Sequence, residues 1–532
     1  MIFGSVDIGT NSVRLAVVDL HPDGTWTTVA SQKEVVRLGD GEFVGGHARL
    51  TSAAMHRAVR VLSRFADVAK GYGADDVVTL ATAASREAEN QEEFVEAVNK
   101  ESGGFLDVRV ISGHEEARLI YLGIRSGIDM NRREKALFLD IGGGSSELVI
   151  ADSRTHHYLD SLKLGAIRLT SEFLSGKAGT ISPGVWSKLC AKVRSTLAPA
   201  SREIASRGFT RMYGSSGTIM SLAEIAARRS RPDGDAPPTM RNYELTLPDL
   251  VSINQMLCRM TLEERRKVPG LTPERADIVI GGAAILQTVM ETVGAGGILI
   301  SDRGLREGIV VDYFIRQLPQ PVDVAVEPES VRVRSVRALA RRCKVDEAHS
   351  RHIRDLALSL FDQTFAMGLH ELTSSRELLD YASYLHDSGF FVSHTNHHQH
   401  SYYLIRNSEL LGFNDIEIEL MAQIAYYHRK SPPRKRHTRF ARLTEKQQSA
   451  VRVLSCCLRL AEALDRGHLA SITGVRLQQK RHGEPVTMVI ESHPDVDISL
   501  EVWAVEGQAE VFGRAYGVPM EIQRPPTAGV KA

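Results

Sequence analysis

Residues 135–153 read KALFLDIGGGSSELVIADS, with an acidic residue and a run of small residues between two apolar segments. Apolar segments on either side of a glycine turn are typical of two strands joined by a tight hairpin. Residues 2–20 repeat this arrangement as IFGSVDIGTNSVRLAVVDL, again with Asp-Ile-Gly where the first apolar segment ends. Two copies of one strand–turn–strand device predict a duplicated α/β unit, with Asp7 and Asp140 at matching positions.

The segments that follow each hairpin predict further strands and helices. Residues 212–227, MYGSSGTIMSLAEIAA, predict a strand that turns through Gly and Ser into a helix. Residues 296–314, GGILISDRGLREGIVVDYF, predict a strand, a turn and a helix. After the first hairpin, apolar spacing predicts a buried strand within residues 76–85 and helices near residues 52–70, 91–100 and 115–125.

The second half of the chain has a different pattern. Residues 316–331 are rich in Pro and Val and predict a linker. From residue 331 to residue 470 the apolar periodicity is helical, whereas residues 475–514 alternate as expected for strands. Residues 521–532 predict a disordered tail.

Composition narrows the class of protein. The chain has 532 residues, of which 43% are apolar and 24% charged, as expected for a soluble globular protein of several domains. No apolar run is long enough for a transmembrane helix, and the N-terminal residues show no signal-peptide pattern. The five cysteines have neither metal nor disulfide spacing, which predicts a reducing, cytoplasmic location. Basic and acidic residues balance at 65 each, so net charge identifies no partner.

The two hairpin loops carry residue types that bind phosphate and metal. A glycine turn lets backbone N–H groups approach phosphate oxygens closely, because no Cβ intervenes. Hydroxyl side chains add donors, and an aspartate at the end of a buried strand can hold a divalent cation beside the phosphates. A single loop of this kind also occurs at ordinary strand ends, but two copies predict a phosphate site.

Six ordered motifs resemble one known family. They are SVDIGTNSVRL, ATAASREAEN, VISGHEEARLIYLG, LFLDIGGGSSELVI, YGSSGTI and SDRGLREGI. Together they resemble the exopolyphosphatase and guanosine-pentaphosphate phosphatase (Ppx/GppA) family, densely over residues 1–315. The resemblance implies an α/β fold of duplicated actin-like, ribonuclease-H-like domains, followed by an all-α HD-like domain and a small α+β C-terminal domain. The expected boundaries are 1–125, 126–315, 330–472 and 473–520, with the tail at 521–532.

The resemblance assigns the catalytic base to Glu116, the second of the two acids in the motif GHEEARLI. Its role would be to draw a proton from a water aimed at the terminal phosphorus. From the residues alone, the simpler explanation is that Glu115 and Glu116 stabilise the first turn of a helix.

The resemblance also places metal and phosphate ligands in both loops. Asp140 and Glu147 are assigned to magnesium and to the attacking water, with Asp7 as a further metal ligand. The expected phosphate-binding residues are Gly9, Thr10, Asn11 and Ser12 in the first loop, Gly142, Gly143, Gly144, Ser145 and Ser146 in the second, and Arg86.

Three assignments keep an alternative. Arg14 could face the phosphates or the solvent. The Arg86 guanidinium can bind a phosphate bidentately, but it could instead start a helix and pair with Glu87 or Glu89. The loop at residues 214–218 either borders the phosphate channel or forms a structural turn.

A second set of candidate metal ligands lies in the helical region. It consists of His349, His386, Asp387, His400, His428 and Asp465, with His397 and His398 near His400. This order resembles the HD-domain metal phosphohydrolases, in which imidazole and carboxylate groups hold one or two divalent cations. Either the region holds a second divalent metal and makes the protein bifunctional, or it is an HD-like scaffold.

Basic residues cluster in the same region. They are concentrated at residues 332–344 and in residues 428–443, HRKSPPRKRHTRFARL. Such local charge predicts a surface for an extended polyanion, with a solvated loop as the alternative. Specific nucleic-acid binding is not expected, because aromatic stacking residues are sparse in these runs.

The resemblance therefore predicts an exopolyphosphatase that releases orthophosphate processively with Mg²⁺, with K⁺ as a further activator. It also implies a homodimer with at most peripheral membrane association. Three alternatives stay open: hydrolysis of guanosine pentaphosphate (pppGpp) at the same site, phosphate transfer from polyphosphate to ADP, and a sensor with vestigial catalysis.

Overall fold

The computed structural model describes residues 1–523, with gaps at 23, 40–48, 132–133, 175, 177, 232–238, 318–329, 482 and 494–495. The chain divides into two compact units, Met1–Val331 (unit 1) and Arg332–Ala532 (unit 2). Every helix in the described part of the chain is too short or too polar to cross a membrane. Most of the predicted linker and of the predicted tail lie outside the described residues, and the finer domain boundaries stay predictions.

The first sheet of unit 1 has the strand order β3-β2-β1-β4-β5. Its strands are β1 (Ile2–Ile8), β2 (Ser12–Leu20), β3 (Trp26–Val35), β4 (Asp76–Ala81) and β5 (Val108–Val110). β1 pairs antiparallel with β2 and parallel with β4. Two of the predicted helices are α1 (Ser52–Gly71) and α3 (Gln91–Glu101), and the short α2 (Ala83–Glu87) precedes α3. Their apolar faces, including Leu62 and Phe94, are buried in the same core as the apolar residues of the hairpin.

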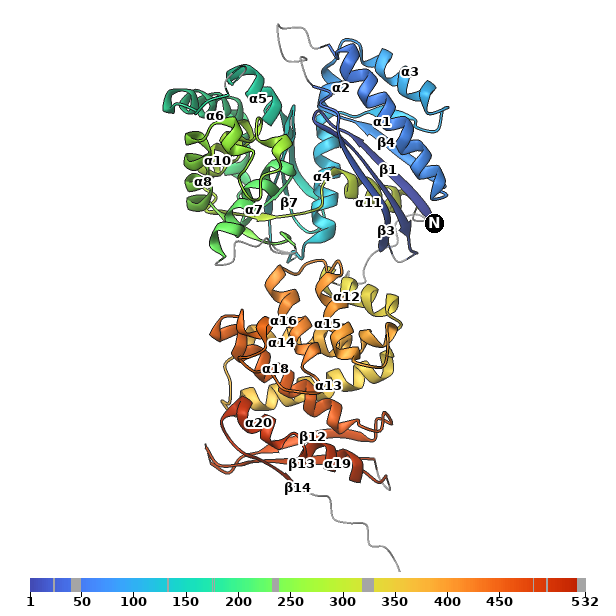
Figure 1. The fold of residues 1–532 in the computed structure, drawn as a ribbon, viewed down its shortest axis with the longest axis vertical. Coiled ribbons are helices and arrows are strands. Elements are labelled where there is room, and N and C mark those ends of the chain that lie inside the picture. Colours follow the sequence, from blue (N-terminus) through green and yellow to red (C-terminus); the bar gives the residue numbers. More distant parts are fainter. Residues whose placement is uncertain are drawn as a thin grey trace, which may run out of the picture. The chain divides into compact units, whose positions relative to one another are not determined.

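The second sheet repeats the first. Its order is β10-β11-β9-β6-β7-β8. The strands are β6 (Ala136–Ile141), β7 (Ser146–Ala151), β8 (His156–Leu162), β9 (Arg211–Ser215), β10 (Glu244–Thr246) and β11 (Gly297–Ile300). The run β8-β7-β6-β9-β11 has the pairings of β3-β2-β1-β4-β5, and β10 adds an antiparallel edge. The predicted duplication and actin-like fold class are therefore confirmed (Figure 1).

Two helices join the sheets at the centre of unit 1. α4 (Gly113–Gly127) contacts β7 and β8 of the second sheet, and α11 (Leu305–Gln317) contacts β1 and β2 of the first. The two helices touch closely, because a Cβ on Gly123 would lie 1.9 Å from the Gly304 carbonyl oxygen. Figure 1 shows α4 between the two sheets. The first turn of α4, which carries Glu116, is thereby held next to both hairpins.

The remaining helices of unit 1 surround the second sheet. They are α5 (Ala166–Phe173), α6 (Pro183–Arg207), α7 (Gly217–Ser230), α8 (Leu247–Arg259), α9 (Leu262–Arg265), α10 (Val279–Val293) and the 3₁₀ turn η1 (Pro273–Arg275). α10 is buried along most of its length and contacts α5, α6, α7 and α8. It is therefore the central helix of this core.

Unit 2 is helical up to residue 464, as predicted. Its helices are α12 (Val331–Arg342), α13 (Glu347–Ala366), α14 (Arg376–Leu385), α15 (His397–Asn407), α16 (Asp415–Tyr426), α17 (Thr438–Ala441) and α18 (Glu445–Leu464), with 3₁₀ turns η2 (Thr373–Ser375) and η3 (Ser388–Phe391). The sheet β12-β13-β14 follows, formed by Ile472–Gln478, Val486–Ser492 and Met520–Gln523. The first residues of the predicted tail, up to Gln523, thus belong to β14.

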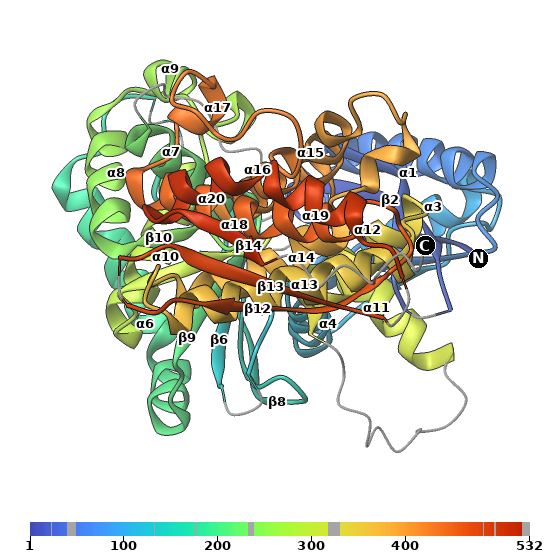
Figure 2. The same ribbon diagram turned by 90° about the horizontal axis from the view of Figure 1, so that it is seen from below.

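The strand prediction for residues 475–514 is wrong in its second half. This half forms two helices, α19 (Ser499–Glu506) and α20 (Ala509–Tyr516), which lie beside the three strands (Figure 2). Val502 and Val505 are buried three residues apart, and both helices contact α18. The apolar run around Trp503 is thus organised by packing on α18, and short apolar runs do not distinguish a strand from a helix by themselves.

Candidate active site in unit 1

The two hairpin loops have the same backbone geometry. Asp7 and Asp140 each stand one residue before the end of their strand, β1 and β6. The Gly9 N–H donates to the Ser12 carbonyl at 3.1 Å, and the Gly142 N–H donates to the Ser145 carbonyl at 2.9 Å. Each turn therefore closes on its own first glycine.

The loops meet across one cavity of about 480 Å³. A Cβ on Gly143 would lie 3.0 Å from the Cβ of Thr10, so glycine allows the second loop to approach the first. The cavity is lined by the predicted loop residues Gly9, Thr10, Asn11, Ser12, Gly142, Gly143, Gly144 and Ser145 and by Asp7, Asp140 and Glu116. The side-chain amide of Asn11 and the Nε of Arg14 are buried there and find no hydrogen-bond partner among the described residues. Such groups fit an anionic ligand.

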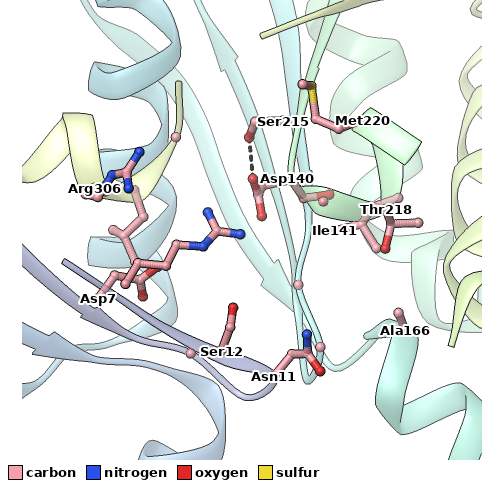
Figure 3. A pocket seen from close by; sticks show the side chains of 18 of the residues that line it. Asp7, Asn11, Ser12, Asp140, Ile141, Ala166, Ser215, Thr218, Met220 and Arg306 are labelled. Atoms are coloured by element: carbon pink, nitrogen blue, oxygen red, sulfur yellow. Dashed lines mark hydrogen bonds between the residues drawn. The ribbon is translucent and has the colours of Figure 1, made fainter. Parts of the chain in front are cut away.

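Asp7 and Asp140 face each other from the two halves (Figure 3). Burial raises the pKa of Asp7 to about 6, against the opposing charges of Arg14 and Arg306, and Asp140 adds to the rise. Burial also raises the pKa of Asp140, although the hydroxyl of Ser215 donates to its carboxylate. Both acids therefore stand in surroundings that an additional cation would stabilise.

Glu116 is placed at this cavity by the N-terminus of α4. The helix starts after Ser112, whose hydroxyl accepts from the Glu115 N–H, as the helix-capping interpretation of this segment expects. Glu115 is turned away and pairs with Arg118, while Glu116 is only 7% exposed. Burial raises the pKa of Glu116 to about 7, Arg86 lowers it, and Asp7 and Asp140 raise it further. A carboxylate with a pKa near neutrality is suited to general base catalysis.

Arg86 contacts the candidate base rather than the loops. Its Nη1 donates to Glu116 Oε2 and to the Ile111 carbonyl, both at 3.0 Å. Glu87, the alternative partner, pairs instead with Arg168. The structure thus brings Arg86 to the site as a group that holds and tunes Glu116.

Glu147 lies behind the base, at the β7 position paired with Asp140. It is 1% exposed and accepts a hydrogen bond from the Ser161 hydroxyl at 2.8 Å. Burial raises its pKa well above the ordinary value, and Glu116 adds to the rise. The Ser146 hydroxyl donates to the Leu164 carbonyl at 2.6 Å, so the structure commits it to the backbone.

Five cationic side chains complete the cavity wall: Arg14, Lys33, Arg275, Arg303 and Arg306. Burial lowers the pKa of Lys33 to about 8, and Arg275 and Arg14 lower it further. Burial and Arg14 lower the pKa of Arg275 to about 10. Sequence reasoning left Arg14 open and missed Lys33 and Arg275, which come from β3 and η1. Arg303 and Arg306 lie within the motif SDRGLREGI, which was the one signal in the sequence for cationic residues of this wall.

The loop at residues 214–218 serves as both a turn and a cavity wall. Ser215, Ser216, Gly217 and Thr218 line the cavity. Ser216 adopts φ of 98° and caps α7 by accepting from the Ile219 N–H, so the turn is also structural. A Cβ on Gly217 would lie 2.0 Å from Nη2 of Arg275, so this glycine gives the guanidinium its place at the start of α7.

The carboxylates of the cleft fit a magnesium ion. Mg²⁺ prefers oxygen ligands and is commonly held by one or two carboxylates together with substrate phosphates. Asp7 and Asp140 provide such oxygens beside the loop amides, and Glu147 lies one layer behind them. Among the described residues, the groups of three or more side chains that already lie close enough to share one metal ion are in unit 2.

In unit 2 the structure brings together most of the predicted histidine set. His349, His386 and Asp387 form one group with Glu462, and Asp387 forms a second with His397 and His428. Asp465 contacts His349 at 2.9 Å. The structure does not bring His400 into either group, and sequence reasoning missed Glu462. Of the predicted basic residues, Arg332 is engaged in ion pairs with Glu377 and Glu417.

The chain is similar to known proteins over both units. Residues 17–317 match the Ppx/GppA phosphatase family, and residues 331–506 match "Ppx/GppA phosphatase, domain III". A guanosine-5'-triphosphate,3'-diphosphate pyrophosphatase of Aeromonas hydrophila is 28% identical over 431 residues, 80% of this chain and 81% of the relative. The structure of an exopolyphosphatase from Cytophaga hutchinsonii is 28% identical with a TM-score of 0.55, covering 59% of this chain and 98% of that one. A Ppx/GppA family structure from Aquifex aeolicus is 25% identical with a TM-score of 0.51, covering 60% and 99%.

The duplicated fold and the match to this phosphatase family define a hydrolase of phosphoric anhydrides. The chain belongs to the Ppx/GppA phosphatase family.

Proposed function

We propose that the protein is an exopolyphosphatase that removes the terminal phosphate of inorganic polyphosphate. The observation that supports this reaction most directly is Glu116, a buried carboxylate with a pKa of about 7 beside two phosphate-binding loops. The cavity also favours a repetitive anion over a nucleotide. None of its described lining residues is Phe, Tyr or Trp, so this lining has no aromatic side chain to stack on a guanine.

In the proposed mechanism the loop amides hold the terminal phosphate. Glu116 accepts a proton from a water molecule, whose oxygen attacks phosphorus in line with the bridging oxygen. The new P–O bond forms as the bridging P–O bond breaks, which releases orthophosphate and a chain shorter by one phosphate. Arg86 keeps Glu116 oriented, and Arg14 and Arg275 neutralise charge on the phosphates.

Magnesium is the metal that we propose for this cleft, with Asp7 and Asp140 as its protein ligands. When bound, it would neutralise charge on the terminal phosphate. Glu147 would then position the attacking water through its contact with Ser161. Activation by K⁺, a homodimer and a cytoplasmic location stay predictions from the family resemblance; the five cysteines are free thiols, which supports a reducing compartment.

The alternative substrate is pppGpp, which the name of the Aeromonas relative favours. Purified protein should be given long-chain polyphosphate and pppGpp side by side with Mg²⁺, and kcat/KM should be measured from released orthophosphate. We expect the higher kcat/KM for polyphosphate. A higher value for pppGpp would overturn the choice of substrate but keep the site.

Adding ADP to the polyphosphate reaction tests the reaction type. Hydrolysis predicts that orthophosphate release is unchanged and that no ATP forms. Formation of ATP in place of orthophosphate would show that the cleft transfers phosphate to a nucleotide.

A further inference from the structure

Five elements of unit 2 bring histidines and acids to one point. His349 lies on α13, His386 and Asp387 follow α14, and His397 starts α15. His428 follows α16, and Glu462 lies on the last turn of α18. All of these residues except Glu462 are at most 9% exposed, and His386 is fully buried.

Each histidine of the cluster is held by its Nδ1 atom. This atom lies 2.7 Å from the Ser383 carbonyl in His386, 2.6 Å from the Ala425 carbonyl in His428 and 3.2 Å from the His394 carbonyl in His397. In His349 it lies 2.9 Å from the Asp465 carboxylate. Metal-binding histidines are oriented in this way, because an acceptor at one ring nitrogen fixes the lone pair of the other.

The Nε2 atoms converge on the carboxylate of Asp387. Its Oδ2 lies 3.4 Å from His386 Nε2 and 3.8 Å from His349 Nε2. Its Oδ1 lies 3.3 Å from His397 Nε2 and 3.9 Å from His428 Nε2. Each oxygen of Asp387 thus faces a different pair of imidazoles, as in a carboxylate that bridges two ions.

The two shorter separations, 3.4 and 3.3 Å, fit ligands of shared cations, and those of 3.8 and 3.9 Å would have to shorten when a cation binds. Two ligands about 2.1 Å from one ion lie about 3.0 to 3.4 Å apart in octahedral or tetrahedral geometry. His349 Nε2 and His386 Nε2 both face Glu462 Oε1, at 3.5 Å for His349 and closer for His386, and all three atoms are buried. His397 Nε2 and His428 Nε2 lie 3.2 Å apart, where two lone pairs would repel each other. A cation in each group would satisfy all of these atoms.

A cavity of about 570 Å³ opens onto this cluster. Its lining includes Asp387, His397, His428 and Glu462, together with Arg429, Lys430 and Arg466 and the aromatic ring of Trp503. Arg429 Nη1 lies 3.1 Å from Nε2 of His397, so a cation on this nitrogen requires the guanidinium to move, and an anion on the cation would give it a partner. Trp503 is 68% exposed and could stack on a base.

We propose that unit 2 carries a second, two-cation site bridged by Asp387, which binds the phosphate group of a nucleoside phosphate. The first cation takes His349, His386 and Glu462, and the second takes His397 and His428. Arg429 and Arg466 contact the phosphate, and Trp503 contacts the base. This site is separate from the phosphatase cleft and does not depend on the function proposed for it.

Counting bound Mn²⁺ tests the metal site. The full chain should be titrated without phosphate and free Mn²⁺ followed by electron paramagnetic resonance. We expect two tight ions per chain, and still two in Asp140→Asn, which removes a ligand of the unit 1 cleft. Asp387→Asn should bind at most one, and His397→Ala one. His400→Ala, on the same face of α15 but outside the cluster, is the matched control and should bind two.

Thermal unfolding by circular dichroism must show that each variant is folded, and His397→Gln and Glu462→Gln serve as milder replacements. Two outcomes would overturn the metal site. One is Asp140→Asn protein that binds no tight Mn²⁺, and the other is folded Asp387→Asn protein that binds as many ions as the wild type.

Adding phosphates to the Mn²⁺-loaded protein tests the ligand. GMP should reduce the effect of the bound Mn²⁺ on water proton relaxation and quench Trp503 fluorescence. We expect Trp503→Leu to weaken GMP binding roughly tenfold, the usual scale of one stacked base, and to leave orthophosphate binding unchanged. If orthophosphate binds as tightly as GMP in both proteins, or if neither binds, the nucleoside phosphate is wrong.

Discussion

The cleft of unit 1 and the histidine cluster of unit 2 both contain buried acids, but the groups that surround the acids differ. In the cleft the acids stand at strand ends and at a helix start, and the cavity around them is lined by arginines and loop amides. In the cluster the acids stand among imidazoles that backbone carbonyls and Asp465 already orient. On the functions that we propose, the cleft would be organised around an anionic substrate that helps to bind the metal, whereas the cluster would offer its ligands before any substrate arrives.

The contrast between the two sites requires that the cleft contains a general base, for which Glu116 is the candidate. Glu116→Gln keeps the size and the Arg86 contact but cannot accept a proton. We expect kcat for polyphosphate to fall by about 10² to 10⁴, the usual contribution of a general base, with little change in KM. Orthophosphate release under saturating substrate measures this.

Glu115→Gln is the matched control, because Glu115 is turned away and pairs with Arg118. Its activity should stay within about twofold of the wild type, as surface ion pairs contribute little. If both variants lose activity equally, the two acids act through the helix and not through chemistry.

A substitution at Arg275 tests whether the cleft binds anions through its cationic side chains. Arg275→Met removes a buried guanidinium whose pKa burial and Arg14 already lower. We expect kcat/KM for polyphosphate to fall about ten- to a hundredfold, the scale of a hydrogen bond to a charged group, mainly through KM. Arg207→Met, which breaks an exposed pair with Glu203 on α6, is the control and should be silent. An unchanged KM in Arg275→Met would remove this residue from the phosphate wall.

The third prediction uses the pH dependence of Glu116. The base works when deprotonated, so kcat/KM should fall as the pH drops below about 7, its pKa. Arg86 lowers this pKa, so Arg86→Met should raise it and move the acidic limb to higher pH. At pH 7 we expect roughly a fivefold loss for a rise of about one pKa unit, because the deprotonated fraction falls from about one half to about one eleventh, with recovery towards pH 9. A uniform loss at every pH would instead mean that Arg86 binds substrate.

Much of the cleft could be predicted because its residues are close together in the chain. Each Asp-Ile-Gly hairpin is a local structure, so strand ends, glycine turns and the two aspartates follow from the sequence pattern. Lys33 and Arg275 could not be found in this way. They reach the loops only through the pairing of β3 with β2 and through the placement of η1 beside α7, and no local pattern distinguishes them from surface residues.

Side-chain direction was the second limit. Arg86 was correctly brought to the site by its motif, but the sequence does not reveal that it faces Glu116. His397 and His400 lie three residues apart on α15 and share a face, so the sequence pattern could not choose between them. The run VWAV around Trp503 reads as a strand because strands and short buried helices share apolar runs.

The smallest expected effect concerns Lys33. Neutralising this side chain tests whether the cleft attracts anions by charge or binds them through the loop amides alone. Its pKa of about 8, lowered first by burial and then by Arg275 and Arg14, means that it loses its charge between pH 7 and pH 9. The kcat/KM reports groups of the free enzyme, so the ratio of its wild-type value to that of Lys33→Met should decline about threefold over this interval, a modest loss for one charge in a wall of five, while deprotonation of Glu116 raises both values by up to about twofold. Lys33→Met should show the lower value already at pH 7 and no further decline. If the alkaline decline persists in this variant, another group titrates, and the loop amides rather than Lys33 bind this part of the polyphosphate.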